Sequence, residues 1–122
     1  MKNLSLFFAF YMVFLFVSCT DDGTAPVVSL TSPTDNQVVV AGQVFQVKGT
    51  ITDDLGLKTI RLSSNLGINE TLTSFDSATK HELNYNITTD ANTPANTYDF
   101  EVIATDDQQL TTSKKVRLKI TK

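Results

Sequence analysis

Cysteine is almost absent from this chain, since Cys19 is the only one among 122 residues. A single cysteine excludes an intramolecular disulfide. Histidine is equally scarce: only His81 is present, so no ligand spacing of a zinc site can be assembled. The chain has 5 glycines and none of them forms a phosphate-binding loop. Any folded part must therefore be held together by apolar packing rather than by cross-links.

Positive charge is also in short supply. The chain has 10 Lys and Arg against 13 Asp and Glu, with a formal net charge of −3. Nucleic-acid binders carry basic patches, so this balance predicts no nucleic-acid partner. Serines are plentiful, but a nucleophile needs a placed base and oxyanion donors, and the sequence offers neither. We expect a protein that is not an enzyme and needs no cofactor.

The long apolar runs that would make a membrane helix are missing as well. The longest run, residues 4–17, follows the basic residue Lys2. It falls short of the ~20 apolar residues that span a bilayer. A basic start and a short apolar region are typical of a signal peptide, which we assign to residues 1–18.

The signal peptide ends in Phe16-Val17-Ser18-Cys19. This segment resembles the lipobox of bacterial lipoproteins, which implies that Cys19 is acylated and anchors the protein in a membrane. Lipid anchoring gains about 0.8 kcal/mol per buried methylene. Residues 19–26 are polar, contain Gly and Pro, and are expected to form a flexible tether. Asp21 and Asp22 resemble the acidic export signal of Bacteroidota lipoproteins, which implies the outer membrane and the cell surface; a periplasm-facing anchor is the alternative.

From residue 27 onward the dominant pattern is alternation of apolar and polar residues, which is typical of half-buried strands. About seven short strands are expected, around these ranges: 28–30, 44–51, 58–62, 71–73, 82–87, 98–105 and 116–121. No sustained helical stripe is present. The sequence therefore predicts one all-β domain over residues 27–122, an antiparallel β-sandwich of immunoglobulin type.

Three segments carry a resemblance to bacterial immunoglobulin-like domains: residues 26–33, residues 52–57 and residues 98–106. The segments His81-Glu82-Leu83 and Pro94 to Tyr98 are similar to a family of unknown function in Bacteroidota lipoproteins. The resemblance implies an Ig-like or cadherin-like sandwich. The antibody-type cysteine pair and core tryptophan are absent. We expect Tyr98 to form a tyrosine corner and place both Tyr85 and Tyr98 in the core.

A doubled Thr-Asp-Asp motif is the main candidate site. Asp53 and Asp54 follow the second expected strand, and Asp106 and Asp107 follow the sixth. In such a sandwich these two loops lie at the same end, and calcium takes six to eight oxygen ligands from flexible loops. The motif predicts a calcium site, although Asp is also a preferred turn former. The segment Asp76-Ser77-Ala78 resembles the Bacteroidota O-glycosylation signal and would place a sugar on Ser77.

These observations favour a membrane-anchored, noncatalytic interaction domain at the bacterial cell envelope. A calcium-dependent adhesin, or an accessory subunit of an outer-membrane complex with a protein partner, are the alternatives. The loop tips expected to face outward hold no aromatic residue, which disfavours a carbohydrate site.

Overall fold

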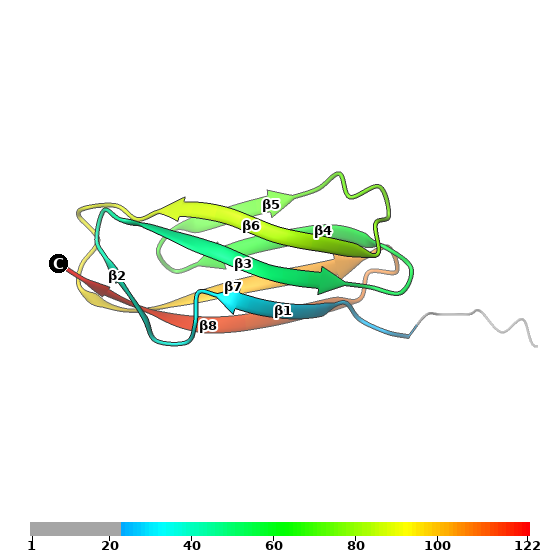
Figure 1. The fold of residues 1–122 in the computed structure, drawn as a ribbon, viewed down its shortest axis with the longest axis horizontal. Helices are drawn as coiled ribbons and strands as arrows, with labels where there is room; N and C mark the ends of the chain where they lie inside the picture. Colours follow the sequence, from blue (N-terminus) through cyan, green and yellow to red (C-terminus); the bar gives the residue numbers. More distant parts are fainter. Residues whose placement is uncertain (1–22) are drawn as a thin grey trace, which may run out of the picture.

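The computed structural model describes residues 23–122, which form two β-sheets packed face to face (Figure 1). Eight strands are present: β1 (Val27–Ser32), β2 (Gln37–Val40), β3 (Val44–Thr52), β4 (Leu57–Ser64), β5 (Ile68–Leu72), β6 (Lys80–Thr88), β7 (Asn96–Asp106) and β8 (Thr111–Thr121). The sheet orders are β1-β3-β6 and β2-β8-β7-β4-β5. The predicted all-β sandwich is therefore confirmed. Within this described part of the chain, no helix has the length and apolar character needed to cross a membrane.

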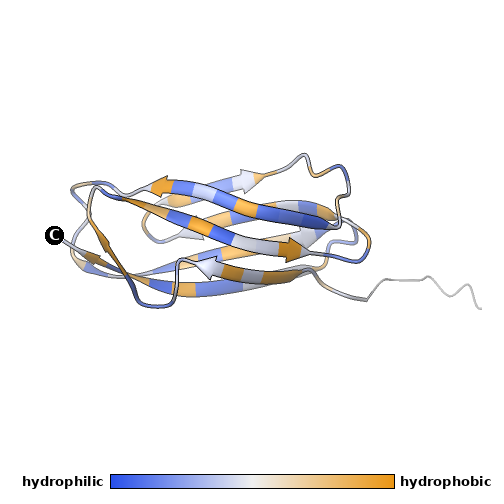
Figure 2. Ribbon diagram, in the orientation of Figure 1, coloured by the Kyte–Doolittle hydropathy of each residue, from blue (hydrophilic) through white to orange (hydrophobic). Residues whose placement is uncertain are grey.

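The core is built by the period-two alternation that the sequence shows. Apolar and polar residues follow one another along each long strand (Figure 2), and the apolar ones meet between the sheets. The fully buried side chains include Val47, Ile60, Leu62, Phe100, Val102 and Leu118. Phe45 of β3 and Phe100 of β7 contact each other across the two layers, with ring centroids 5.7 Å apart and planes at 87°. Aromatic edge-to-face packing of this kind joins the sheets in place of a disulfide.

Strand β2 is not anticipated by the sequence pattern, which gives about seven strands. It has only four residues and pairs in parallel with β8, from Gln37 opposite Leu118 to Val40 opposite Thr121. Val39 is buried, whereas Val38 and Val40 are 58% and 45% exposed. A short valine run has no clear alternation. The partner strand also lies far along the chain, so only the folded topology reveals the pairing.

The register of β4 against β7 shifts between Leu57 and Thr59, so Leu57 is buried and Lys58 is exposed. Two expected side-chain positions differ from the structure. Tyr85 and Tyr98 are half-buried and pack at the margin of the core. The predicted tyrosine corner is present: Tyr98 Oη donates to the carbonyl oxygen of Pro94 at 2.9 Å.

The loops gather at two ends of the sandwich. At the end where the chain enters the first strand, here called the tether end, lie residues 53–56, 73–79 and 107–110 (Figure 1). At the opposite end, the distal end, lie residues 41–43, 65–67 and 89–95. The turn at 33–36 lies at neither end but beside Arg117, partway along β8.

Candidate functional site

The two Thr-Asp-Asp loops lie together at the tether end, as the topology predicted. Asp53 directly follows β3 and begins the loop to β4. Its Oδ2 accepts hydrogen bonds from the backbone amides of Leu55 at 3.0 Å and Gly56 at 2.9 Å. The residue is only 7% exposed, and its Oδ1 is buried without a hydrogen-bond partner. Asp53 thus closes a turn with one oxygen and leaves the other free.

Asp106, the last residue of β7, repeats this arrangement. Its Oδ1 accepts from the amides of Gln108 at 2.8 Å and Leu110 at 2.9 Å. The side chain is fully buried, and Oδ2 has no partner. A buried acceptor without a hydrogen bond is uncommon in folded proteins, so this oxygen is a candidate ligand for a bound group. The motif therefore contributes one inward aspartate per loop.

The second aspartate of each motif is exposed. The backbone amide of Asp107 donates to the carbonyl oxygen of Gly56 at 3.0 Å, which ties the two loops to each other. A Cβ placed on Gly56 would lie 2.7 Å from both Asp107 Oδ2 and the Ser77 carbonyl oxygen, so these oxygens crowd around this glycine. Within residues 23–122, no group of three or more His, Cys, Asp or Glu side chains is arranged to hold a metal ion. Calcium at Asp53, Asp54, Asp106 and Asp107 stays a prediction that would need carbonyl ligands as well.

The loop of residues 73–79 lies against these turns. The amide of Leu57 donates to the Ala78 carbonyl at 2.9 Å, and the amide of Asp53 donates to the Thr79 carbonyl at 2.9 Å. Asp76 and Ser77 have positive φ angles of 49° and 55°, in the left-handed region that few non-glycine residues adopt. Ser77 is exposed, so its hydroxyl group is accessible. Its glycosylation stays a prediction.

His81, the single histidine, is the second residue of the edge strand β6. It is half-buried, and its ring contacts Phe75 edge to face with centroids 4.8 Å apart. This contact joins the loop of residues 73–79 to the sheet. Cys19, Asp21 and Asp22 lie outside the described residues, so their predicted roles in lipidation and export stay predictions.

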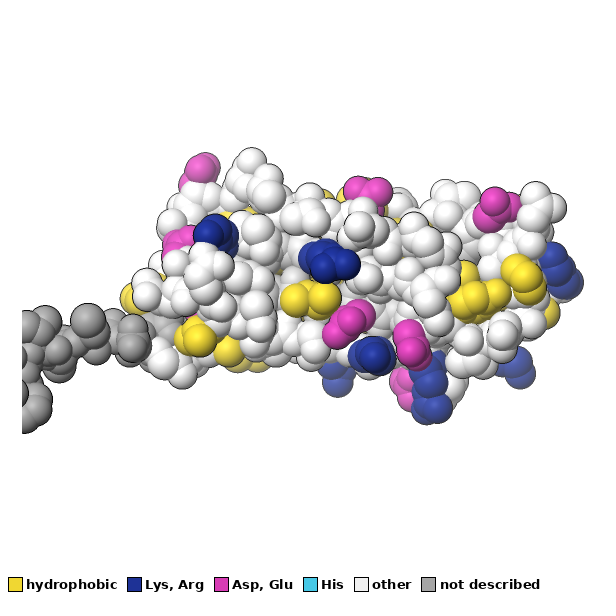
Figure 3. Space-filling model, turned by 180° about the vertical axis from the view of Figure 1, so that it is seen from behind, with side chains coloured by type: hydrophobic (Ala, Val, Ile, Leu, Met, Phe, Trp, Pro, Cys, Tyr) yellow, Lys and Arg dark blue, Asp and Glu magenta, His cyan; other side chains and the backbone are white. Residues whose placement is uncertain are grey.

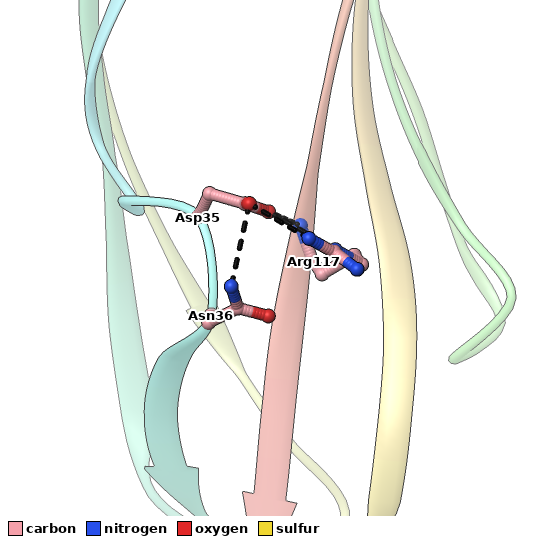
Figure 4. Close-up of polar contacts among 3 residues, drawn as sticks. All are labelled: Asp35, Asn36 and Arg117. Atoms are coloured by element: carbon pink, nitrogen blue, oxygen red, sulfur yellow. Dashed lines mark hydrogen bonds and ion pairs between the residues drawn. The ribbon is translucent and has the colours of Figure 1, made fainter.

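A polar clamp that the sequence does not reveal joins the β1–β2 turn to β8. Asp35 Oδ1 accepts from the backbone amide of Arg117 at 2.9 Å, and Arg117 Nη2 donates to Asp35 Oδ2 at 3.1 Å (Figure 4). Asn36 Nδ2 donates to the same carboxylate at 3.4 Å, and the amide of Asn36 donates to the Arg117 carbonyl. The hydrogen bonds from Arg117 hold the pKa of Asp35 below its usual value, and Asp35 raises the pKa of Arg117. These contacts fix the start of β2.

Comparison with known proteins agrees with this architecture. The chain is similar in fold to the fibronectin(III)-like modules of Clostridium thermocellum CbhA: TM-score 0.58, 12% identity, over 77% of this chain and 94% of that chain. It is also similar to a Niemann-Pick type C2 protein from Japanese carpenter ant: TM-score 0.50, 12% identity, over 80% and 90% of the two chains. At this identity the likeness concerns the fold alone. No curated protein matches the chain.

The family model described as the bacterial Ig domain matches residues 26–102, which run from the buried Pro26 through β7 as far as Val102. This range includes seven of the eight strands in whole or in part. The match agrees with the sheet topology and with the predicted immunoglobulin-like fold. The chain belongs to the bacterial Ig domain family.

Proposed function

We propose that this protein is a noncatalytic Ig-like interaction module, held at the bacterial cell envelope by lipid on Cys19. The observation that carries the proposal is the separation of the two ends of the sandwich. The chain enters β1 at the tether end, a few residues after Cys19, and the loops of residues 65–67 and 89–95 lie at the opposite end (Figure 1). Loops on a rigid scaffold are where binding function concentrates. An anchor at Cys19 would leave the distal loops facing away from the membrane.

The anchor is tested by metabolic labelling with an alkyne-tagged palmitate in the native bacterium. Label on the wild-type chain that is lost in Cys19→Ser would support lipidation, because the variant lacks the acyl-accepting thiol. A Thr20→Ser variant keeps the cysteine and the segment before it, and serves as the matched control. Equal labelling of wild type and Cys19→Ser would contradict the anchor.

For localisation we propose the outer membrane with the domain on the cell surface, as Asp21 and Asp22 suggest; the periplasmic face is the alternative. Protease added to intact cells separates the two orientations. Loss of the domain from intact cells supports surface display, and loss only after lysis supports the periplasmic face. If the acidic pair directs export, replacing Asp21 and Asp22 by asparagine should make the domain resistant to protease in intact cells and sensitive only after lysis.

A protein partner at the envelope is the second part of the proposal. The outer face of the five-stranded sheet carries charges of both signs with small, separate apolar patches (Figure 3). Asp99 faces Arg117 and Glu101 faces Lys115 across β7 and β8. Large obligate interfaces are more apolar than this. The face therefore favours a transient contact over a permanent subunit interface. Affinity capture of the lipidated protein from its own cells, with and without chelator, would identify such a partner.

A calcium-dependent adhesin is the second candidate function, favoured by one observation. Asp53 Oδ1 and Asp106 Oδ2 are both buried and unpartnered, and both loops lie at the tether end. A bound cation would satisfy such oxygens. Calorimetry with calcium chloride, with magnesium chloride as control, tests this directly. Heat from calcium that is absent in Asp106→Asn, together with a Tm lowered by chelator, would support the site; no heat and an unchanged Tm would contradict it.

A further inference from the structure

A shallow pocket of about 280 Å³ lies at the distal end, formed by three segments that are far apart in the sequence. Its lining residues are Asn65, Leu66, Asp90, Asn92, Thr93, Pro94 and Tyr98. The β4–β5 turn, the β6–β7 loop and the start of β7 therefore converge there. Tyr98 is half-buried and lines this pocket, so the distal end does present an aromatic residue. The alternation pattern places Tyr98 in the core and therefore does not predict this position.

The polar groups of the pocket are held in place and keep unused hydrogen-bonding capacity. Asp90 Oδ1 accepts from the amide of Asn92 at 2.7 Å, which leaves Oδ2 as a free acceptor. Asn65 Oδ1 accepts from the amide of Asp99 at 3.0 Å, which leaves the Nδ2 group as a free donor. The side-chain amide of Asn92 adds a donor and an acceptor. Hydroxyl groups both donate and accept hydrogen bonds. The carboxylate can accept from the hydroxyl groups of a ligand, and the two side-chain amides can donate to them.

Apart from Thr93, the rest of the lining is apolar or aromatic, and hydrogen bonds hold it in place. Leu66 is half-buried, and Pro94 has a fixed ring. The hydroxyl group of Tyr98 is tied to the Pro94 carbonyl at 2.9 Å, which fixes the position of the aromatic ring. The amide of Thr93 donates to the Asp90 carbonyl at 3.0 Å and closes the loop that carries both residues. The pocket thus combines a preorganised apolar surface with a polar rim.

The chemistry of the lining selects among ligand classes. No Lys, Arg or His lines the pocket, which disfavours phosphate, sulfate or carboxylate ligands. Asp90 is its single acidic residue, too few carboxylates for a calcium site. Its volume of about 280 Å³ lies just below the range for small-molecule pockets, about 300–1,000 Å³. A ligand with one apolar face and several hydroxyl groups, the size of a single ring, fits these constraints.

We propose that the distal pocket binds a neutral monosaccharide unit, with Asp90, Asn92 and Asn65 contacting hydroxyl groups and Tyr98 with Pro94 contacting the C–H face of the ring. This inference names a ligand class for the interaction module and rests on that proposed function. The pocket is shallow, so we expect a Kd of about 1 mM. Affinity capture tests whether the domain binds a partner, and a sugar titration tests whether the distal pocket binds a monosaccharide. The failure of one proposal is therefore distinguishable from the failure of the other.

The test is a ¹H–¹⁵N NMR titration of the full chain in a detergent without a sugar headgroup. The probes are glucose, galactose, mannose and N-acetylglucosamine, each up to about 50 mM, far above the expected Kd. The expected result is saturable shifts of the amides of Asn65, Asp90, Asn92 and Tyr98 with at least one sugar. Glycerol at the same concentration is the control for a nonspecific polyol effect.

Two variants complete the test. Asp90→Asn keeps an oxygen for the Asn92 amide but replaces the free carboxylate acceptor, and Asn92→Ala removes the side-chain amide. Each should weaken binding about tenfold, as expected for a lost hydrogen bond to a charged or amide group. Asn84→Ala, an exposed asparagine of β6 outside the pocket, should leave Kd unchanged. No shift with any sugar, shifts equal to those from glycerol, or shifts spread over both ends of the sandwich would overturn the proposal.

Discussion

Asp35 and Arg117 form a two-point contact across 82 residues of sequence, in which one carboxylate binds both the backbone amide and the guanidinium group of the same residue. Arg117 presents its amide and carbonyl to residues 35 and 36, so the turn before β2 adds to the edge of β8. The short strand β2 then continues this pairing in parallel. One ion pair thus positions the crossing of the chain from the first sheet to the second.

The contact makes stability depend on pH in a defined direction. Hydrogen bonds from Arg117 lower the pKa of Asp35 from its usual 3.8. A carboxyl group with a lowered folded-state pKa stabilises the fold above the unfolded-state pKa, and this contribution is lost as pH falls through the folded-state value. We therefore expect Asp35→Asn to lower Tm by a few degrees at pH 7 and by less near pH 2. Thermal melts between these pH values check this.

Salt and a matched variant separate this ion pair from a general charge effect. Both side chains are more than half exposed, so 1 M salt should remove much of the difference at pH 7. Asp54→Asn, at an exposed loop position with no ion pair, should change Tm little at pH 7. A deficit of Asp35→Asn that is the same at pH 2 and pH 7 would contradict a role for the charge of the carboxylate.

Gly49 is required by the close approach of β1 to β3. A Cβ at this position would overlap the carbonyl oxygen of Ser29 and lie 3.1 Å from Leu30 Cα, both backbone atoms that cannot move aside freely. We expect Gly49→Ala to lower the free energy of unfolding by about 2–4 kcal/mol. Urea unfolding measures this.

Gly67→Ala is the matched control for this prediction. Gly67, unlike Gly49, has a positive φ angle, of 88°, and a Cβ there meets no atom within 4 Å. Its expected cost is therefore the backbone strain alone, about 1–2 kcal/mol. A loss in Gly49→Ala that is no greater than the loss in Gly67→Ala would contradict the close approach of β1 as the reason for this glycine.

Thr89 is a buried polar residue that closes the distal end of the first sheet. Its hydroxyl group donates to the Gln43 carbonyl at 2.9 Å and accepts from the amide of Gly42 at 2.9 Å. Thr89→Val keeps the shape but leaves both groups without this partner, so we expect a loss of about 1–3 kcal/mol in unfolding free energy. Thr88→Val, at the exposed neighbouring position, should be close to neutral. Similar unfolding free energies for the two variants would contradict the role of the hydroxyl group.

The sequence predicts the sheets well where a strand has one face buried and one exposed. In β3 the apolar positions Phe45, Val47 and Ile51 are the buried ones, because a period of two places alternate residues on the same face. It fails for β2, whose four residues are defined by a partner late in the chain. Tyr85 and Tyr98 are predicted in the core but are half-buried at its margin. Alternation predicts which face of the sheet a residue lies on, but not how far it lies from the margin of the sheet.

The candidate site is only partly accessible to sequence reasoning for a related reason. The strand order places the loops of Asp53 and Asp106 at one end, and this follows from counting strands. Which oxygen of each carboxylate closes the turn, and which stays free, depends on loop geometry that composition does not encode. The distal pocket is hidden for the same reason, since its lining comes from three separate segments.

The aspartate turns give a last prediction, which separates their structural role from the predicted calcium site. Asp106 Oδ1 accepts two backbone amides that no other group satisfies. Asp106→Ala should therefore lose about 1–3 kcal/mol of unfolding free energy even in chelator. Asp107→Ala removes an exposed side chain and should lose little in chelator. Urea unfolding in chelator and in calcium measures both variants. If Asp107→Ala destabilises the protein only in calcium, the loop binds the ion; if Asp106→Ala is neutral in chelator, the carboxylate does not stabilise the turn.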